Sequence, residues 1–168
     1  MSRRAVVLFF LILGAGLLLA GPAPASGPPD PGEPAHPFTL PDLDGRPVML
    51  SSFKDRLVLL HFWATWCPTC REEMTILEEA ARAHTRTLVI LGVNLGEKRS
   101  KVATYVKTSG IPFPILLDAR GKVAAAYGVL SLPITLVIGS DGRVAEHVQM
   151  GSLDRAGLER ILDRHPPD

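Results

Sequence analysis

Cys67 and Cys70 are the only cysteines of the 168-residue chain, and Pro68 and Thr69 separate them. An apolar stretch, residues 57–63, precedes the pair, and apolar residues at helical spacing follow it. The first turn of a helix has unpaired backbone amides and the positive end of the helix dipole, and both stabilise a thiolate. We therefore expect Cys67 to be a nucleophile near neutral pH. Cys70, one turn on, would attack the mixed disulfide that Cys67 forms.

Two other uses of a close cysteine pair fit the sequence less well. A purely structural disulfide would close a very short loop and would remove little entropy from the unfolded chain. Half of a zinc site would need two more thiol or imidazole ligands, and the sequence has no second cysteine pair and no closely spaced histidine pair. The pair is therefore interpreted as a redox-active disulfide that needs no metal and no separate cofactor.

The neighbours of the cysteines are interpreted as substrate-binding residues. Pro68 suits the first helical position because it has no N–H to leave unpaired there. Thr69 adds a small polar side chain between the sulfurs, and Trp66 adds an apolar side chain beside them.

The remaining pattern predicts the elements that position the dithiol. Apolar segments predict strands at residues 57–63, 87–95, 113–117, 134–138 and 144–148, the last two joined by a turn. Helical spacing predicts helices at residues 68–84, 98–109, 121–127 and 152–162, the last with Ser152 as N-cap. Residues 38–40 and 48–50 predict an N-terminal β-hairpin. Together these indicate an α/β three-layer sandwich with a mixed central sheet and helices on both faces.

The N-terminal residues predict export. Arg3 and Arg4 precede an apolar run, residues 5–20, which small residues follow as far as Ala25. This order is typical of a secretory signal peptide, and the run is also nearly long enough to stay as a membrane anchor. Residues 1–25 are therefore assigned to a signal peptide or an N-terminal membrane anchor, and the protein to the periplasm or the outer face of the cytoplasmic membrane.

Residues 26–37 are rich in Pro and Gly and carry almost no apolar side chain. Such a segment cannot bury enough surface to offset its ordering entropy, so we expect a linker, followed by the folded domain at residues 38–168. The formal net charge of +1 gives no electrostatic reason to expect nucleic acid as a partner, and another protein is the expected one.

Beyond the cysteines, several motifs resemble one family. These are FWATWCPTCREEM at residues 62–74, FTLPDLDG at 38–45, VNLGE at 93–97 and YGVLSLPIT at 127–135. The chain is similar in these motifs to the membrane-tethered or periplasmic thioredoxins of the TlpA/ResA group, over most of residues 38–162. The resemblance implies a thioredoxin-like fold with a central helical insert.

The resemblance also implies roles for single residues. Cys67 would be the attacking sulfur, Cys70 the resolving one, and Pro133 a cis-proline facing the dithiol. A cis bond after Leu132 would turn backbone groups toward the cysteines, where an extended substrate could pair with them. The alternative for Pro133 is an ordinary strand-edge proline.

Glu73 matches a carboxylate that the family uses near its dithiol. Residues three apart share a helix face, so Glu73 should lie beside Cys70. The hypothesis is a partly buried glutamate with a raised pKa that exchanges protons with Cys70, and the alternative is a solvated residue on the helix surface. Glu97 matches a recurrent family acid for which the sequence suggests no role.

Two positions depart from the family pattern. His61 stands where cytosolic thioredoxins carry a buried aspartate and this group more often has asparagine. It is expected to form a neutral hydrogen bond in the core, with tuning of the cysteines as the alternative. Thr75 replaces a proline common in the group, so a kink in this helix should be weaker.

The resemblance favours a reductase of disulfides in exported proteins, with apocytochrome c as a candidate substrate and a membrane protein as electron donor. The alternatives are a disulfide oxidase or isomerase and, with less support, a copper-handling thioredoxin relative, for which His84 and His147 are poorly placed. A peroxidase would need a threonine where Ala64 stands. A binding module with an incidental disulfide would keep its function in Cys67→Ser.

Overall fold

The computed structural model describes residues 28–86, 88–148 and 153–166. Its central sheet has five strands in the order β5-β4-β3-β6-β7. β3 lies in the middle, parallel to β4 and antiparallel to β6, so the sheet is mixed as predicted. The strands are β3 (Leu57–Trp63), β4 (Leu88–Leu95), β5 (Ile115–Asp118), β6 (Ile134–Ile138) and β7 (Val144–Val148).

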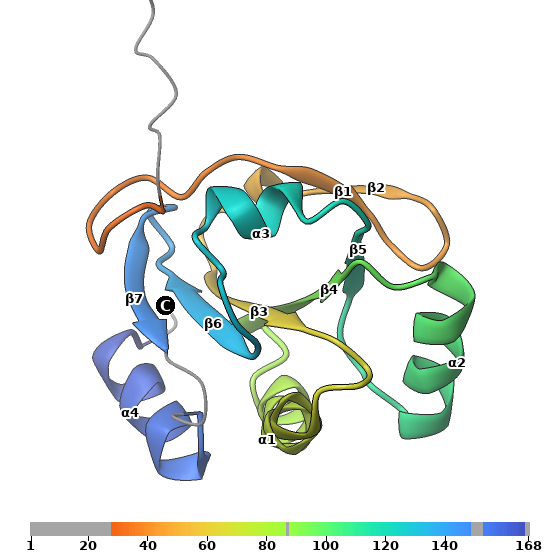
Figure 1. Ribbon diagram of the computed structural model, residues 1–168. Coiled ribbons are helices and arrows are strands. Elements are labelled where there is room, and N and C mark those ends of the chain that lie inside the picture. The colour runs from red at the N-terminus through yellow and green to blue at the C-terminus, as the bar shows by residue number, and fades with distance from the viewer. Residues whose placement is uncertain (1–27, 87, 149–152, 167–168) are drawn as a thin grey trace, which may run out of the picture.

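Helices cover both faces of this sheet (Figure 1), which confirms the expected three-layer α/β sandwich. On one side lie α1 (Pro68–Ala83), α2 (Arg99–Ser109) and α4 (Arg155–Arg164). The other side carries α3 (Lys122–Ala126), the hairpin β1 (Thr39–Pro41) and β2 (Pro47–Met49), and a 3₁₀ helix, η1 (Leu50–Phe53).

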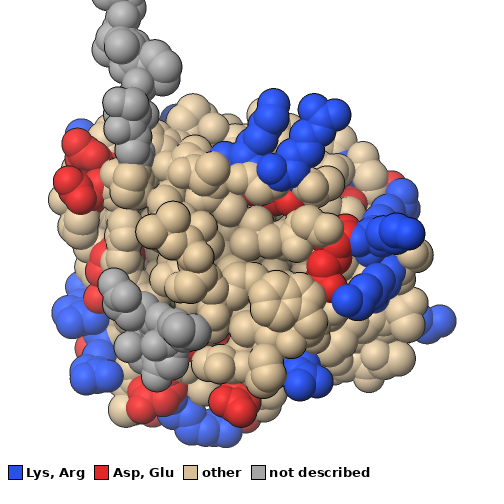
Figure 2. Space-filling model, viewed as in Figure 1, with Lys and Arg blue, Asp and Glu red and all other residues tan. Residues whose placement is uncertain are grey.

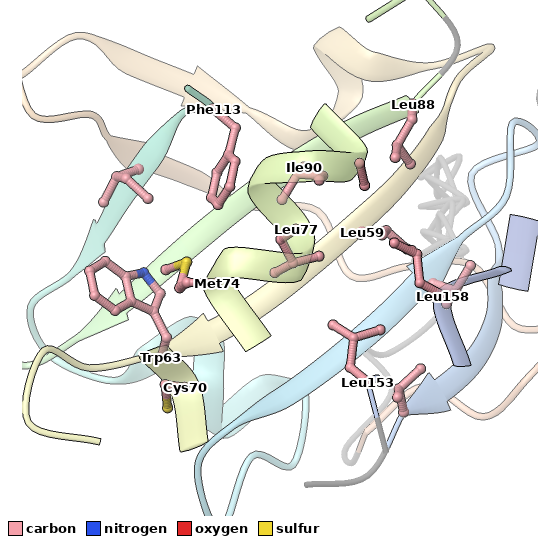
Figure 3. Close-up of a cluster of buried hydrophobic side chains, with 14 of the residues drawn as sticks. Leu59, Trp63, Cys70, Met74, Leu77, Leu88, Ile90, Phe113, Leu153 and Leu158 are labelled. Atoms are coloured by element: carbon pink, nitrogen blue, oxygen red, sulfur yellow. The ribbon is translucent and has the colours of Figure 1, made fainter. Parts of the chain in front are cut away.

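All seven residues of β3 are buried, because other elements cover both faces of the strand. Leu57, Leu59 and Trp63 point into the cluster beneath α1, which Figure 3 shows, while the alternating residues point into the cluster beneath α3. A strand buried in this way has a continuous apolar sequence, which is why its bounds can be predicted.

The last helix differs from the prediction. α4 begins at Arg155, and its N-cap is Asp154, whose Oδ1 accepts the Gly157 N–H at 2.6 Å. The predicted N-cap, Ser152, lies outside the described residues. Asp and Ser are equally good N-cap residues, so residue type does not distinguish Asp154 from Ser152. In the structure Leu153 is buried before the helix begins, and the helix starts after it.

The described part of the predicted linker, residues 28–37, also differs from the prediction, because it is bonded to the domain. The Gly32 N–H donates to Val144 O at 2.7 Å, and the Val144 N–H donates to Glu33 O at 2.9 Å. His147 Nε2 lies 2.9 Å from Pro29 O, and the Tyr127 hydroxyl donates to His36 O at 2.7 Å. We call residues 28–36 the N-terminal strap. Its anchors are mostly backbone groups, which an apolar count does not register.

The predicted signal peptide or anchor, residues 1–25 with its apolar run at 5–20, lies outside the described residues. Within the part of the chain that the structure does describe, no helix has the length and apolar character to cross a membrane.

Candidate functional site

The two cysteines lie where β3 passes into α1. Cys67 is the N-cap of α1 and Pro68 follows at the start of the helix. Cys67 and Cys70 form a disulfide with their Cα atoms 5.3 Å apart. Cys67 Sγ also accepts the Cys70 N–H at 3.1 Å, so the sulfur sits among the unpaired amides of the first turn, as the sequence predicts.

The surroundings of the two sulfurs are unequal. Cys70 is fully buried and Cys67 is 4% exposed, while Trp66, directly before the pair, is 64% exposed. In Figure 3 Cys70 lies at one end of the cluster that also holds Trp63 and Met74. The pair is thus approachable from the Cys67 side and packed against the core on the Cys70 side.

A buried polar group lies behind the first turn of α1. His61, on β3, is fully buried, and its Nδ1 is 2.8 Å from Thr135 Oγ1 on β6. Glu73, the residue predicted beside Cys70, is 4% exposed, and its Oε2 is 3.8 Å from the same Nδ1. Glu73 is therefore not a solvated glutamate on the helix surface.

Burial lowers the pKa of His61 from 6.5 to about 3, because a charged imidazolium loses its hydration there. The ring is therefore neutral near pH 7, so its contact with Glu73 is not an ion pair at that pH. The expected neutral hydrogen bond of His61 in the core is confirmed, with Thr135 as its partner.

Glu97 ties the loop before Cys67 to the end of β4. Its carboxylate accepts the backbone N–H and the hydroxyl of Thr65, both at 2.7 Å. It also accepts Asn94 Nδ2 at 2.8 Å and pairs with Lys101 Nζ at 2.7 Å. Glu97, for which the sequence suggests no role, thus holds Thr65, which lies two positions before Cys67.

The same contacts determine the acidity of Glu97, whose side chain is 7% exposed. Burial acts to raise its pKa, but the hydrogen bonds from Asn94, Lys101 and Thr65 together outweigh burial and lower the pKa from 4.5 to about 2. Folding therefore favours the ionised carboxylate.

We expect Glu97→Gln to lower the free energy of unfolding at pH 7 by about 3 kcal/mol, since a pKa of about 2 against 4.5 corresponds to roughly that much. In the parent this contribution is present above pH 4.5 and is lost as the pH falls toward 2. Urea unfolding at pH 7, 4.5 and 3 measures it. An equal loss of stability with acid in parent and variant would contradict the assignment.

The loop before β6 brings the remaining predicted residues to the same edge of the sheet. Ile134 pairs with Phe62 in the register of β3 and β6, so the residues just before it lie level with those that follow Trp63. The Leu132–Pro133 bond is cis, which is the geometry that the resemblance implies for Pro133. Pro133 is buried, Leu132 half-buried, and Leu130 in the same loop is 98% exposed.

The copper-handling alternative gains no support. His84 is the C-cap of α1, at the opposite end of that helix from Cys67, and His147 on β7 is bonded to the N-terminal strap. In residues 28–86, 88–148 and 153–166, no group of three His, Cys, Asp or Glu side chains is placed to hold a metal ion.

Sequence reasoning missed three polar residues of this site: Thr65, Asn94 and Thr135. Asn94 had a signal, because a polar residue at the end of an apolar strand and three positions before an acid is unusual. Thr135 becomes visible only once β3 is paired with β6, where it stands directly opposite His61.

Comparison with known sequences places these features in a family context. Residues 31–147 match the model of the AhpC/TSA family. Thiol-disulfide oxidoreductase ResA of Geobacillus thermodenitrificans is 34% identical over 137 residues, which are 81% of this chain and 78% of the relative. Thioredoxin-like protein YneN of Bacillus subtilis is 36% identical over 135 residues, 79% of this chain and 78% of the relative.

Solved structures agree. A thiol:disulfide interchange protein of the thioredoxin family from Chlorobium tepidum superposes with a TM-score of 0.71 at 27% identity, covering 79% of this chain and 94% of its own. A secreted disulfide oxidoreductase of Mycobacterium tuberculosis, described as homologous to E. coli DsbE, gives a TM-score of 0.68 at 25% identity, over 76% of this chain and 95% of its own.

Proposed function

The chain belongs to the AhpC/TSA family and is a thioredoxin-like thiol-disulfide oxidoreductase, and we propose that it reduces disulfides of exported proteins. The observation that carries the proposal is the cysteine pair at the N-terminus of α1, with Cys67 slightly exposed next to the exposed Trp66 and Cys70 fully buried. Apocytochrome c is the candidate substrate, and a membrane protein is the candidate electron donor.

In the proposed reaction the reduced Cys67 thiolate attacks one sulfur of the substrate disulfide. A mixed disulfide forms, and the other substrate sulfur leaves as a thiolate that takes up a proton. The Cys70 thiol then loses its proton and attacks Cys67 Sγ, which restores the Cys67–Cys70 disulfide and releases the second substrate thiol. Two electrons pass from the protein dithiol to the substrate, and the donor must return them.

The geometry supports this division of labour between the sulfurs. The Cys70 N–H points at Cys67 Sγ, so it would stabilise a thiolate at the attacking position. Cys70 is fully buried, so a substrate disulfide cannot reach it directly. It can attack only the mixed disulfide at the neighbouring Cys67.

A cysteine trap tests the proposal. In Cys70→Ser the resolving thiol is missing, so substrates should stay attached through Cys67 when the reduced variant meets oxidised proteins of the exported fraction. Mass spectrometry of the adducts names the substrates, and Cys67→Ser/Cys70→Ser is the control that should capture none. Recovery of equal amounts from trap and control would contradict the proposal.

Glu73 is proposed as the group that takes the proton from Cys70 in the resolving step. It follows Cys70 by three positions on α1, is buried, and contacts His61, so its carboxylate is held in the core. In Glu73→Gln the pH profile of alkylation by a neutral reagent should differ from that of the parent. Glu72→Gln, one residue away and exposed, is the matched control. An unchanged profile in Glu73→Gln removes the proposal.

Substrate binding is proposed for both sides of the dithiol. Trp66, Pro68 and Thr69 would contact the substrate from the α1 side, since Trp66 and Pro68 are exposed there. Leu132 and Pro133 would contact it from the β6 side, where an extended peptide could bond to the backbone.

Export remains a proposal that the N-terminal residues support. Residues 1–25 have the order of a signal peptide or anchor, and one structural relative is a secreted protein.

A further inference from the structure

The edge of the sheet that carries the dithiol also carries an unbalanced group of cations. Lys98 is the N-cap of α2 and Arg99 its first residue, shortly after the end of β4, and Arg120 and Lys122 follow β5. β3, β4 and β5 are parallel, so these segments and the segment with Cys67 all leave the sheet at its carboxyl edge. We call these four residues the basic arc.

Hydrogen bonds make the basic arc continuous with the dithiol loop. Thr65, two residues before Cys67, is held by Glu97, and Lys98 is the next residue. The Gly96 N–H then donates to Asp118 O at 3.2 Å, and Asp118 Oδ1 accepts the Lys122 N–H at 3.0 Å. Figure 2 shows blue side chains gathered over the positions of α3 and α2 in Figure 1, beside a broad tan area.

Two carboxylates of the described residues, Glu97 and Asp118, lie at the same edge, but Glu97 pairs with Lys101 and Thr65 and Asp118 accepts backbone N–H groups. All four side chains of the basic arc are exposed, and none has an ion pair with a residue that the structure describes. The opposite edge also carries cations: Arg143 lies within 4.0 Å of Asp141 and Arg56 donates to backbone carbonyls, while Lys54 and Arg86 are exposed and have no ion pair with a described residue. Lys98, Arg99, Arg120 and Lys122 therefore give the edge beside the dithiol a local positive potential, although the whole chain has a formal net charge of only +1.

The basic arc also runs against the electrostatics of α2. Anionic side chains are favoured at a helix N-terminus, yet α2 has Lys98 as N-cap and Arg99 next, with no acidic residue in its first turn and no side-chain cap. Departures from local preferences, such as cations at a helix N-terminus, occur most often at functional sites. Attraction of anions to this edge is a function that would account for the departure in α2.

The opposite flank of the dithiol is apolar and has no charge. Residues 127–133 contain no acidic or basic side chain, and Leu130 in that loop and Trp66 beside Cys67 are both strongly exposed. A partner that binds here meets apolar side chains on the β6 side and cations on the β4 and β5 side.

We propose that this surface selects disulfides carried on acidic polypeptide segments, with carboxylates on one side of the target cysteines meeting Lys98, Arg99, Arg120 and Lys122. This rests on the proposed disulfide reduction. The arc increases the rate of encounter, and the sulfur chemistry stays that of the dithiol.

Three peptides with the same internal disulfide and apolar centre, flanked by Asp, by Ser or by Lys, test the proposal with the full-length reduced protein. At about 0.01 M ionic strength, where charges act over about 30 Å, the acidic peptide should react about tenfold faster than the basic one. At about 1 M the rates should converge. Equal rates at low salt would overturn the inference, whereas no reduction of any peptide would overturn the proposed function.

Charge reversal locates the effect. Lys98→Glu/Lys122→Glu should abolish or reverse the preference, while Lys54→Glu/Arg86→Glu, which makes the same change at the opposite edge, should retain it. The rate with the uncharged disulfide of 2-mercaptoethanol corrects for any change in thiol reactivity. A preference that survives this reversal, or that the control pair removes equally, overturns the assignment.

Discussion

Serine in place of Cys67 should lower the rate of disulfide exchange by at least about a thousandfold, because the attacking sulfur is removed and a serine hydroxyl is not ionised near neutral pH. The substitution keeps the shape of the N-cap, and serine is itself a good cap, so α1 should still begin at Pro68. The loss would therefore be chemical and not a failure to fold.

Reduction of insulin by the parent and by Cys67→Ser, with dithiothreitol as electron source, measures the effect. Thr75→Ser, on an exposed position of the same helix, is the control and should react like the parent. Activity within tenfold of the parent in Cys67→Ser would show that the dithiol is incidental, as in a binding module.

His61→Asn should make the protein markedly less sensitive to acid. The folded pKa of His61, about 3, lies below its ordinary 6.5, so the unfolded chain binds the extra proton between these values and stability falls as the pH drops through that range. The full difference corresponds to about 4–5 kcal/mol, of which about 2–3 kcal/mol falls between pH 6.5 and 4.5. Asparagine has an amide that can reach Thr135 and does not titrate.

Urea unfolding at pH 7 and pH 4.5 isolates this contribution, because Glu97 acts only below 4.5. The quantity to compare is the difference between the two pH values, since His61→Asn also changes packing. Glu73 Oε2 at 3.8 Å would partly offset a charge on the ring, so Glu73→Gln should steepen the acid loss in the parent background. His84→Asn, at the end of α1, is the control. The same pH difference in His61→Asn as in the parent would refute the prediction.

The sequence predicts most of this fold because its strongest signals are local. β3, β6 and β7 have the predicted bounds, since each is an apolar run or a hairpin strand that ends at turn residues. The position of the dithiol follows in the same way, because a buried strand, two cysteines and a helical pattern stand next to one another in the chain.

The parts that were missed depend on contacts between distant segments. Glu97 can bond to Thr65 because β3 and β4 are parallel neighbours, so the segments that follow them meet at one edge of the sheet. The burial of Glu73 was one of two alternatives that the sequence left open, and it depends on the layer formed by β3 and β6, where His61 and Thr135 lie. No spacing within α1 distinguishes Glu73 from its exposed neighbour Glu72.

The N-terminal strap covers part of an edge strand through which two copies of the chain could otherwise pair. β7 is the outermost strand of its sheet, and an open strand edge is a template for pairing with another chain. Gly32, Glu33 and Ala35 occupy the backbone groups around the start of β7, between Gly142 and Val144. A chain shortened to Phe38, the boundary that composition alone suggests, would lose this cover and present that edge to its own copies.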